Sequence, residues 1–178
     1  MYNVDESGIK WEIVERRNLF RRSAYIQKVE IMFNGFFGRY NHTIDEKGRI
    51  TLPAAFREML GEDPFILSGF DGNLSIMSFT RFQLLRDKIY SQNMADINSR
   101  RLRRLIFSTA TQLEFDKNGR FVIPQPLRDI AKLDGNVLVL GVGKDIELWN
   151  PDLYAAQEET SEGTASAADL VSNFDLTF

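Results

Sequence analysis

The sequence predicts a mainly β fold with short helices, an α+β architecture in which two tandem β-β-α-β-β repeats face each other about a pseudo-two-fold axis. Two observations lead to this prediction. A fourteen-residue motif occurs twice in the 178-residue chain, at a constant offset of 71 residues, with β-prone segments on both sides of each copy. Each copy spans roughly 40 residues, which is too few to bury an adequate core alone, so the two apolar faces are expected to pack together.

The repeated motif carries five identities in fixed order. Residues 45–58 read DEKGRITLPAAFRE, and residues 116–129 read DKNGRFVIPQPLRD. The identical pairs are Asp45/Asp116, Gly48/Gly119, Arg49/Arg120, Pro53/Pro124 and Arg57/Arg128. An Asp first and a Gly fourth favour a type I turn, because Asp accepts a nearby backbone N–H and Gly tolerates positive φ. We therefore expect a turn-forming hairpin loop in each copy.

The first copy contains all five elements of the unit. In chain order we expect antiparallel strands over 39–44 and 49–52, a short helix with Pro53 at its first position, and strands over 65–69 and 74–78. Phe56, Met59 and Leu60 form one apolar stripe on the helix, and Gly61 is placed to end it.

The second copy predicts the same elements, separated from the first by a helical connector. They are strands over 113–115 and 120–123, a helix after Pro124, and strands over 137–141 and 146–149. In the connector, Phe82, Leu85 and Ile89 predict a helix that begins near Thr80. A second connector helix is expected over 98–107, with its arginines on the solvated side. Plain solvation or a subunit interface is favoured for these arginines over a polyanion site.

The composition excludes several classes of site. The chain has no Cys and a single His, His42, so we expect no disulfide, no thiol nucleophile, no metal site and no cofactor. No nucleophile with a base and an orienting group is recognisable, which argues against an enzyme and against a small-molecule substrate. No apolar run approaches the roughly 18 residues of a membrane-spanning helix. We therefore expect a cytoplasmic protein without a membrane partner.

Charge is distributed unevenly along the chain, whose formal net charge is −3. Residues 145–178 contain eight acidic residues and no Lys or Arg, which leaves 22 basic and 17 acidic residues in 1–144. A basic body with an acidic end is compatible with a polyanionic partner such as nucleic acid. The alternative is that the acidic end only keeps the protein soluble.

Three segments resemble the MraZ family of bacterial transcriptional regulators: YNHTIDEKGRITLPAAFRE, DKNGRFVIPQPLRD and VLVLGVGKDIELWN. The resemblance covers roughly residues 32–154, and each repeat is similar to the AbrB-type swapped-hairpin DNA-binding unit. It implies a double-split β-barrel built from one chain. It also implies a homo-oligomeric, nucleoid-associated ring that binds short direct repeats of double-stranded DNA in the promoter of its own division and cell-wall gene cluster.

The resemblance assigns DNA contact to the Asp-x-x-Gly-Arg motif, and therefore to Lys47, Arg49, Lys117 and Arg120. Arginine suits this role because its planar fork can bond a phosphate, or the O6/N7 edge of guanine, in two places. The alternative is that each arginine forms a salt bridge with the turn aspartate, Asp45 or Asp116, and only stiffens the hairpin.

Two repeated arginines on the short helices, Arg57 and Arg128, are further candidates, since the AbrB-type resemblance makes them DNA-backbone contacts. The alternative is an ion pair with the hairpin acid or with a neighbouring subunit. For His42, which lies beside the first turn, a bond to a neighbouring residue is favoured over a phosphate contact.

The chain is expected to divide into an N-terminal extension (1–35), a first repeat (36–81), a helical connector (82–109), a second repeat (110–153) and an acidic tail (154–178). Met32 is a candidate functional start, with an ordered extension as the alternative. Two other functions stay open. One is an antitoxin-like AbrB-fold protein with a protein partner, and the other is a structural ring-forming protein whose arginines join subunits.

Overall fold

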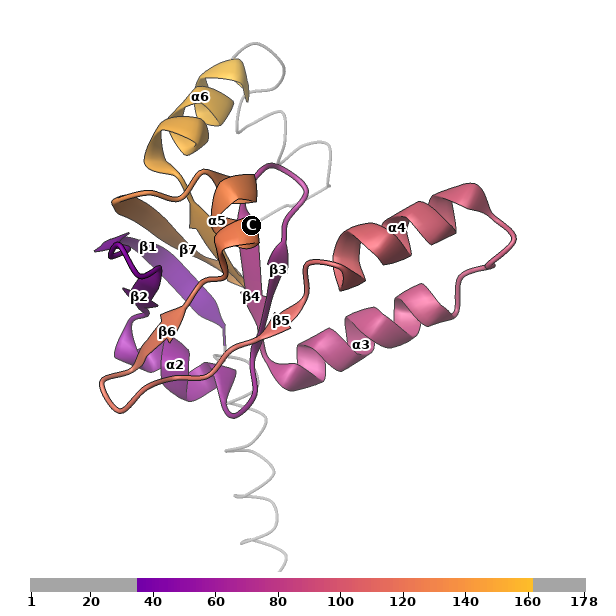
Figure 1. Ribbon diagram of the computed structural model, residues 1–178, viewed down its shortest axis with the longest axis horizontal. Coiled ribbons are helices and arrows are strands. Elements are labelled where there is room, and N and C mark those ends of the chain that lie inside the picture. Colours follow the sequence, from indigo (N-terminus) through magenta and orange to yellow (C-terminus); the bar gives the residue numbers. More distant parts are fainter. Residues whose placement is uncertain (1–34, 162–178) are drawn as a thin grey trace, which may run out of the picture. The chain divides into compact units, whose positions relative to one another are not determined.

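The computed structural model describes residues 35–161, with side chains described through residue 158 (Figure 1). In chain order the elements are β1 (Phe36–Thr43), β2 (Arg49–Thr51), α2 (Ala54–Leu60), β3 (Phe65–Ser68), β4 (Leu74–Met77), α3 (Phe79–Tyr90), α4 (Ile97–Phe107), β5 (Thr111–Gln112), β6 (Arg120–Val122), α5 (Gln125–Ala131), β7 (Asn136–Gly143), β8 (Ile146–Trp149) and α6 (Pro151–Ser161). The expected N-terminal extension, apart from its last residue, and the expected tail beyond residue 161 lie outside the described residues.

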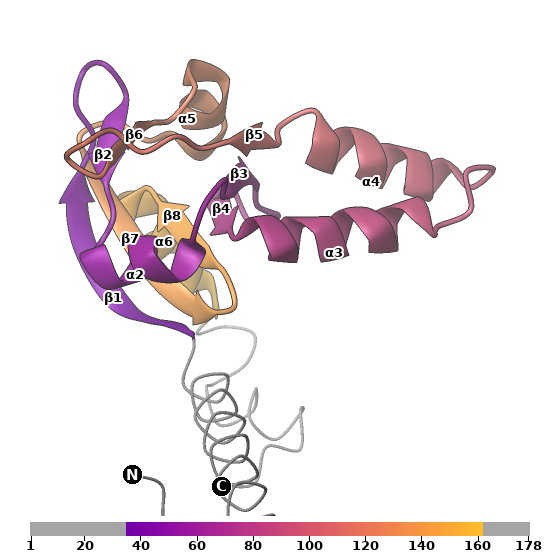
Figure 2. The same ribbon diagram turned by 90° about the horizontal axis from the view of Figure 1, so that it is seen from below.

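Strands of the two repeats interleave in one six-stranded antiparallel sheet. Its order is β1-β7-β8-β4-β3-β5, and a separate two-stranded ribbon pairs β2 with β6. The first strand of each repeat pairs with a strand of the other repeat, β1 with β7 and β5 with β3. This exchange confirms the predicted fold class, because two β-β-α-β-β units swap strands within one α+β body (Figures 1 and 2).

The register of the ribbon shows where the pseudo-two-fold axis runs. Ile50 pairs with Phe121, the residue at the same position of the other repeat. The neighbouring pairs in this ladder are Arg49 with Val122 and Thr51 with Arg120. Exchanging the repeats maps these two pairs onto each other. The axis therefore passes through the middle of the ribbon.

One apolar core is shared by both repeats. Its buried members from the first repeat are Phe36, Ile44, Ile50, Leu52, Phe56, Leu60, Ile66, Leu74 and Ile76. Its members from the second include Leu113, Phe121, Ile123, Leu127, Leu133, Val137, Val139, Ile146 and Leu148. Since burial of this apolar surface is the main favourable term in folding, neither repeat keeps its stabilisation without the other.

The predicted pairing of strand 39–44 with 49–52, and of 113–115 with 120–123, is wrong. Both Asp-x-x-Gly turns form, but the short strands that follow them pair with each other as β2 and β6. Residues 113–115 are not a strand. β2 and β6 each have three residues with a single buried side chain, so a local hairpin would bury little. Pairing across the axis brings both side chains into the common core, which favours the exchange.

The short helices of the repeats lie where they were predicted, with two corrections. Pro53 and Pro124 are the N-caps of α2 and α5, not their first helical residues. Phe56 and Leu60 are buried, but Met59 is 36% exposed. A helix of seven residues buries only a narrow stripe, here at positions i and i+4, so the i+3 side chain faces solvent.

Helices α3 and α4 form a hairpin that extends away from the sheet (Figure 2). The N-cap of α3 is Ser78, whose Oγ accepts a backbone N–H, so the prediction of Thr80 is wrong. Two arginines of α4 are not on its solvated side. Arg103 donates to the last carbonyls of α3, and Arg100 donates to carbonyls of the connecting loop. These arginines hold the two helices together at the end of the hairpin.

The region expected as an acidic tail begins with a helix. Residues 154–161 belong to α6, so the first part of the segment predicted as an acidic tail is helical. Tyr154 packs edge-on against Trp149 of β8 at 5.4 Å between ring centroids, and the Arg39 guanidinium of β1 lies 5.1 Å from its ring centroid. These aromatic contacts hold α6 against the sheet. The Ser, Thr and acidic residues of this segment gave no sign of such contacts.

Candidate nucleic-acid interface

The two Asp-x-x-Gly turns have matching hydrogen bonds. In residues 45–49 (loop 1), the Gly48 N–H donates to the Asp45 carbonyl over 2.8 Å, and in residues 116–120 (loop 2) Gly119 donates to Asp116 over 2.8 Å. Each aspartate carboxylate also accepts the N–H groups of the residues two and four positions later. The glycines have φ of +76° and +72°, as the turn requires. The loops therefore present their side chains at matched positions.

Each loop arginine forms an ion pair with the aspartate of its own loop. Arg49 Nε donates to Asp45 Oδ2 over 2.7 Å, and Arg120 Nε donates to Asp116 Oδ2 over 2.8 Å. The salt bridge weighed as the alternative to DNA contact is thus present. However, the arginine side chains remain 35% and 37% exposed. A guanidinium has five N–H donors, and an ion pair through Nε and Nη2 leaves its outer edge available to a partner.

The same hydrogen bonds keep both turn aspartates ionised. The Arg49 side chain, followed by the Arg49 backbone N–H, lowers the pKa of Asp45. The Arg120 backbone N–H and side chain lower the pKa of Asp116 to about 2. Both carboxylates are therefore charged at neutral pH, and each fixes the orientation of its arginine.

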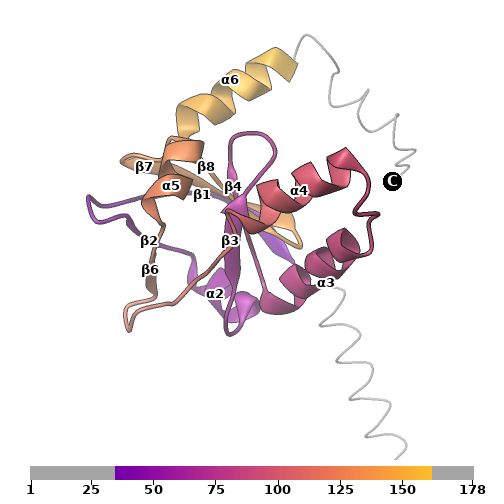
Figure 3. The same ribbon diagram turned by 45° about the vertical axis from the view of Figure 1, so that its right-hand side comes forward.

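Both loop arginines lie on the outer face of the β2–β6 ribbon. Side chains alternate along a strand, and Ile50 and Phe121 point into the core, so Arg49 and Arg120 point outward. The two arginines are diagonal neighbours in the ladder, a position at which Cα atoms lie about 7–8 Å apart. The ribbon lies at the edge of the unit away from the α3–α4 hairpin (Figure 3). Two guanidinium groups related by the pseudo-two-fold axis thus share one exposed surface.

Arg57 and Arg128 each reach the loop of the opposite repeat. The Arg128 guanidinium lies against Gly48, where an added Cβ would be 2.7 Å from Arg128 Cζ. The Arg57 guanidinium covers Gly119 in the same way, with Nε 3.0 Å from an added Cβ and Cζ closer still. Within residues 35–158, neither arginine forms the ion pair with a hairpin acid that was weighed as an alternative. Both arginine side chains instead pack closely against the turns.

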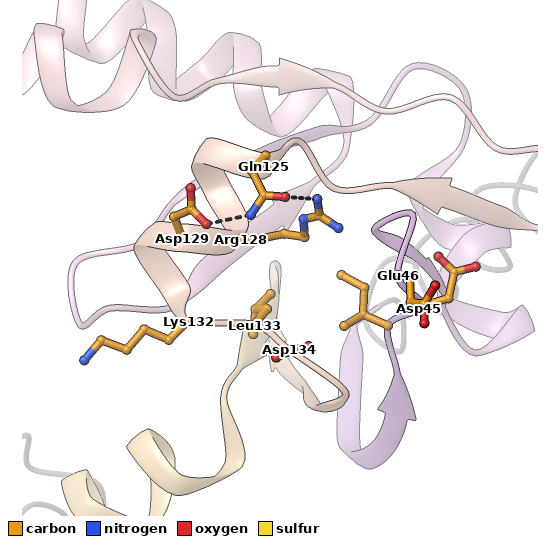
Figure 4. A pocket seen from close by; sticks show the side chains of 9 residues that line it. Asp45, Glu46, Gln125, Arg128, Asp129, Lys132, Leu133 and Asp134 are labelled. Carbon is orange, nitrogen blue, oxygen red and sulfur yellow. Dashed lines mark hydrogen bonds between the residues drawn. The ribbon is translucent and has the colours of Figure 1, made fainter.

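A polar groove of about 530 Å³ lies between loop 1 and α5, and the Arg128 side chain points across it toward the loop (Figure 4). Gln125 Oε1 accepts from Arg128 Nη2, while Gln125 Nε2 donates to Asp129 Oδ1 over 2.6 Å. Arg128 is therefore braced by two side chains of its own helix. In the first repeat, Arg57 Nε instead donates to the Leu52 carbonyl over 3.3 Å.

The lysines predicted to contact DNA are exposed at the tips of the loops, Lys47 in loop 1 and Lys117 in loop 2. Their neighbours differ, since Glu46 precedes Lys47 whereas Asn118 follows Lys117. Loop 2 is therefore the more positive of the two tips.

His42, beside the first turn, is half-buried in β1. Burial lowers the pKa of His42, so its ring is neutral at pH 7.

The sequence predicted the residues of both loops but not the residues that support them. Gln125 and Asp129 were not predicted, although their i, i+4 spacing on a helix is a signal for a side-chain hydrogen bond. The contacts of Arg57 and Arg128 with opposite turns carry no local signal. Among the residues that the structure describes, no group of three or more His, Asp or Glu could hold a metal ion, and no helix is long and apolar enough to cross a membrane.

Comparison with known proteins agrees with the two-repeat architecture. A family model described as "MraZ protein, putative antitoxin-like" matches residues 35–105 and again residues 106–174. The transcriptional regulator MraZ of Thermomicrobium roseum is 38% identical over 137 residues, which cover 76% of this chain and 96% of that protein. The proteins of the same name from Carboxydothermus hydrogenoformans and Desulfitobacterium hafniense are 38% and 37% identical, covering 71% and 79% of this chain and 94% and 99% of their own. Since the family is matched twice, and its members align over nearly their whole length, the chain belongs to the MraZ family.

Proposed function

We propose that this protein is a transcriptional regulator that binds duplex DNA through the outer face of the β2–β6 ribbon. Its relatives are named transcriptional regulators. The observation that carries the proposal is the pair of partly exposed arginines, Arg49 and Arg120, on one two-fold-related surface. A two-stranded ribbon is narrow enough to enter the major groove. The protein acts by occupying DNA, not by catalysis.

The ion pairs with Asp45 and Asp116 prepare the arginines for this role. Each carboxylate holds the inner edge of a guanidinium, so less side-chain freedom is lost when the outer edge bonds a base or a phosphate. Lys47 and Lys117 carry no such constraint and contact phosphates as mobile point charges. In this proposal the arginines recognise the base sequence, and the lysines attract the DNA phosphates regardless of sequence.

Specificity in this proposal comes from assembly. One ribbon with its two loops offers two arginines and two lysines, so a single copy binds weakly and its affinity falls steeply with salt. A homo-oligomeric ring at the nucleoid would place several ribbons against short direct repeats in the promoter of its own division and cell-wall gene cluster. Each bound ribbon raises the effective concentration of the next.

Selection of bound sequences from a pool of random DNA duplexes tests the proposal. Mobility-shift titrations then compare the selected duplex with a scrambled one. Arg49→Ala is expected to abolish the preference for the selected duplex and to leave particle size, measured by light scattering, unchanged. Arg104→Ala, on the exposed side of α4, is the matched control.

Two outcomes would contradict the proposal. If Arg49→Ala binds the selected duplex as tightly as the wild type, the ribbon is not the reading surface. If an Arg49→Ala/Arg120→Ala variant dissociates into monomers, the arginines join subunits and the protein is structural.

A further inference from the structure

We infer that Arg57 and Arg128 are positioning residues, and that each sets the shape of the DNA-contacting loop of the opposite repeat. The inference rests on the proposed function of the loops. It assigns these arginines an indirect role in place of the direct backbone contact that the family resemblance implies.

The first reason is where the guanidinium groups lie. Gly48 and Gly119 are buried, and the space that a side chain would occupy at either glycine is filled by the arginine of the other repeat. Arg57 and Arg128 are themselves half-buried. A long basic side chain that serves a phosphate keeps its charged head in water, whereas these heads are packed on the turn backbone.

The second reason is that loop 1 and the residue before it bond to the second repeat. The Ile123 N–H donates to the Gly48 carbonyl over 2.8 Å, and the Ile44 N–H donates to the Gly135 carbonyl over 2.8 Å. Arg128 adds a third contact, which is also at Gly48. Contacts with the second repeat therefore help to position loop 1.

The third reason is that each arginine is held by a hydrogen bond within its own repeat. Arg128 is held by Gln125, which is oriented in turn by Asp129. Its Nε is buried with no hydrogen-bond partner within the described part of the chain, as expected for a side chain enclosed by protein. Arg57 is held by the Leu52 carbonyl at the end of the first repeat's own ribbon strand. Both side chains are fixed before any DNA arrives.

Hydrogen exchange of the full chain without DNA tests the crossed arrangement directly. Arg128→Met removes the guanidinium and keeps an apolar stem, and it is expected to speed exchange roughly tenfold over 45–49 while 116–120 stays within twofold. Arg57→Met is expected to do the reverse. Arg101→Met, on the exposed side of α4, is the matched control and should change neither loop.

This measurement overturns the inference if either variant loosens the loop of its own repeat, or both loops equally. Should a methionine variant fail to fold, Arg128→Lys and Arg57→Lys repeat the test. Lysine keeps the charge and lacks the planar fork, so the same crossed pattern is expected. Wild-type protection in both lysine variants would overturn the inference, because the guanidinium groups would then not be needed to set the loops.

Binding to the selected duplex separates positioning from direct contact. Arg57→Met is expected to weaken binding about tenfold in the wild type, and less than twofold when Lys117→Ala and Arg120→Ala have already removed the contacts of loop 2. An equal loss in both backgrounds would mean that Arg57 itself touches DNA. If the wild type binds no DNA, the proposed function fails, while the exchange experiment still decides whether the crossed contacts set the loops.

Discussion

Loop 1 and loop 2 have the same backbone conformation and differ in net charge. In both, an aspartate accepts the same N–H groups, a glycine takes positive φ and an arginine follows the turn. The residues between them differ, Glu46 and Lys47 in loop 1 and Lys117 and Asn118 in loop 2. As a result, residues 45–49 carry no net charge and residues 116–120 carry +1.

This difference separates residues that shape the loop from residues that are free to vary. Within the loops, the identical positions are the Asp, the Gly and the Arg, whose hydrogen bonds or backbone conformation form the turn and so constrain them. The positions that differ have exposed side chains at the tip. Each loop can therefore adjust its attraction for DNA without changing its fold, and loop 2 is expected to be the more attractive to phosphate.

The largest effect is expected in the core beneath the ribbon, because both loops depend on it. Phe121→Ala should lower the free energy of unfolding by about 3–5 kcal/mol, and Ile50→Ala by about 2–5 kcal/mol. Both side chains are almost fully buried, at 2% and 1% exposure. Thermal unfolding followed by circular dichroism should show one transition in each variant, since the repeats share a core.

Val122→Ala is the control for these core variants, because Val122 is on the outer face of the ribbon and is 54% exposed. Its effect should stay within about 0.5 kcal/mol. Two separate transitions, one for each repeat, would mean that the repeats fold independently and that the two loops should be compared as separate domains.

A smaller effect is expected at the turn glycines. Gly48, Gly119 and Gly72 have φ of +76°, +72° and +82°, so Ala at any of them should cost about 1–2 kcal/mol through backbone strain. Only at Gly48 and Gly119 does a guanidinium occupy the space of the new Cβ, whereas nothing lies within 4 Å at Gly72. Urea titrations should therefore rank Gly48→Ala and Gly119→Ala below Gly72→Ala in stability. Equal costs at all three would show that the arginines move aside freely.

The sequence was sufficient to predict the loops but not their partners. An Asp and a Gly at fixed spacing predict a turn locally, and the turns at Asp45 and Asp116 formed as expected. Strand pairing depends on the whole chain, so the nearest strand was wrongly chosen as the partner of β2. The same limit applies to Arg57 and Arg128, whose contacts join residues about 60–80 positions apart. The symmetric ladder at Ile50 and Phe121 becomes visible only once the two repeats are placed together.

Neutralising one charge at each loop tip tests whether the difference in charge between the loops affects DNA binding. Glu46→Gln gives loop 1 the +1 charge of loop 2 and is expected to tighten DNA binding about two- to fivefold, since exposed charges contribute about 0.5–1 kcal/mol. Lys117→Gln should weaken binding by a similar factor and lower the salt slope by about 0.9. Fluorescence anisotropy at several salt concentrations measures both.

Glu62→Gln is the control for this exchange, because it changes the net charge by the same amount at an exposed site outside both loops. Were Glu62→Gln to tighten binding as much as Glu46→Gln, the effect would come from the net charge of the protein, and the difference between the loop tips would have no role.

The smallest effect is expected at the turn aspartates, whose exposed ion pairs stabilise the loops at neutral pH and lose this contribution only in acid. An unfolded aspartate has a pKa of about 3.9, whereas the hydrogen bonds of Arg120 lower the pKa of Asp116 to about 2 in the folded protein. Between these values the unfolded chain binds more protons, so stability falls as the pH decreases. The contribution of loop 2 is fully present above about pH 4 and lost through about pH 2, and the pKa of Asp45 is lowered in the same direction.

Urea midpoints of the wild type and of Asp116→Asn, measured from pH 7 to pH 2, isolate this contribution from that of other acids. Asparagine retains an oxygen for the backbone N–H groups but has no charge for Arg120, so the variant should lose stability less steeply below pH 4. Parallel curves would mean that the ion pair does not hold the loop. Because Asp45 accepts the equivalent bonds in loop 1, Asp45→Asn should flatten the curve as well, and the double variant should show the sum of both changes if the loops titrate independently.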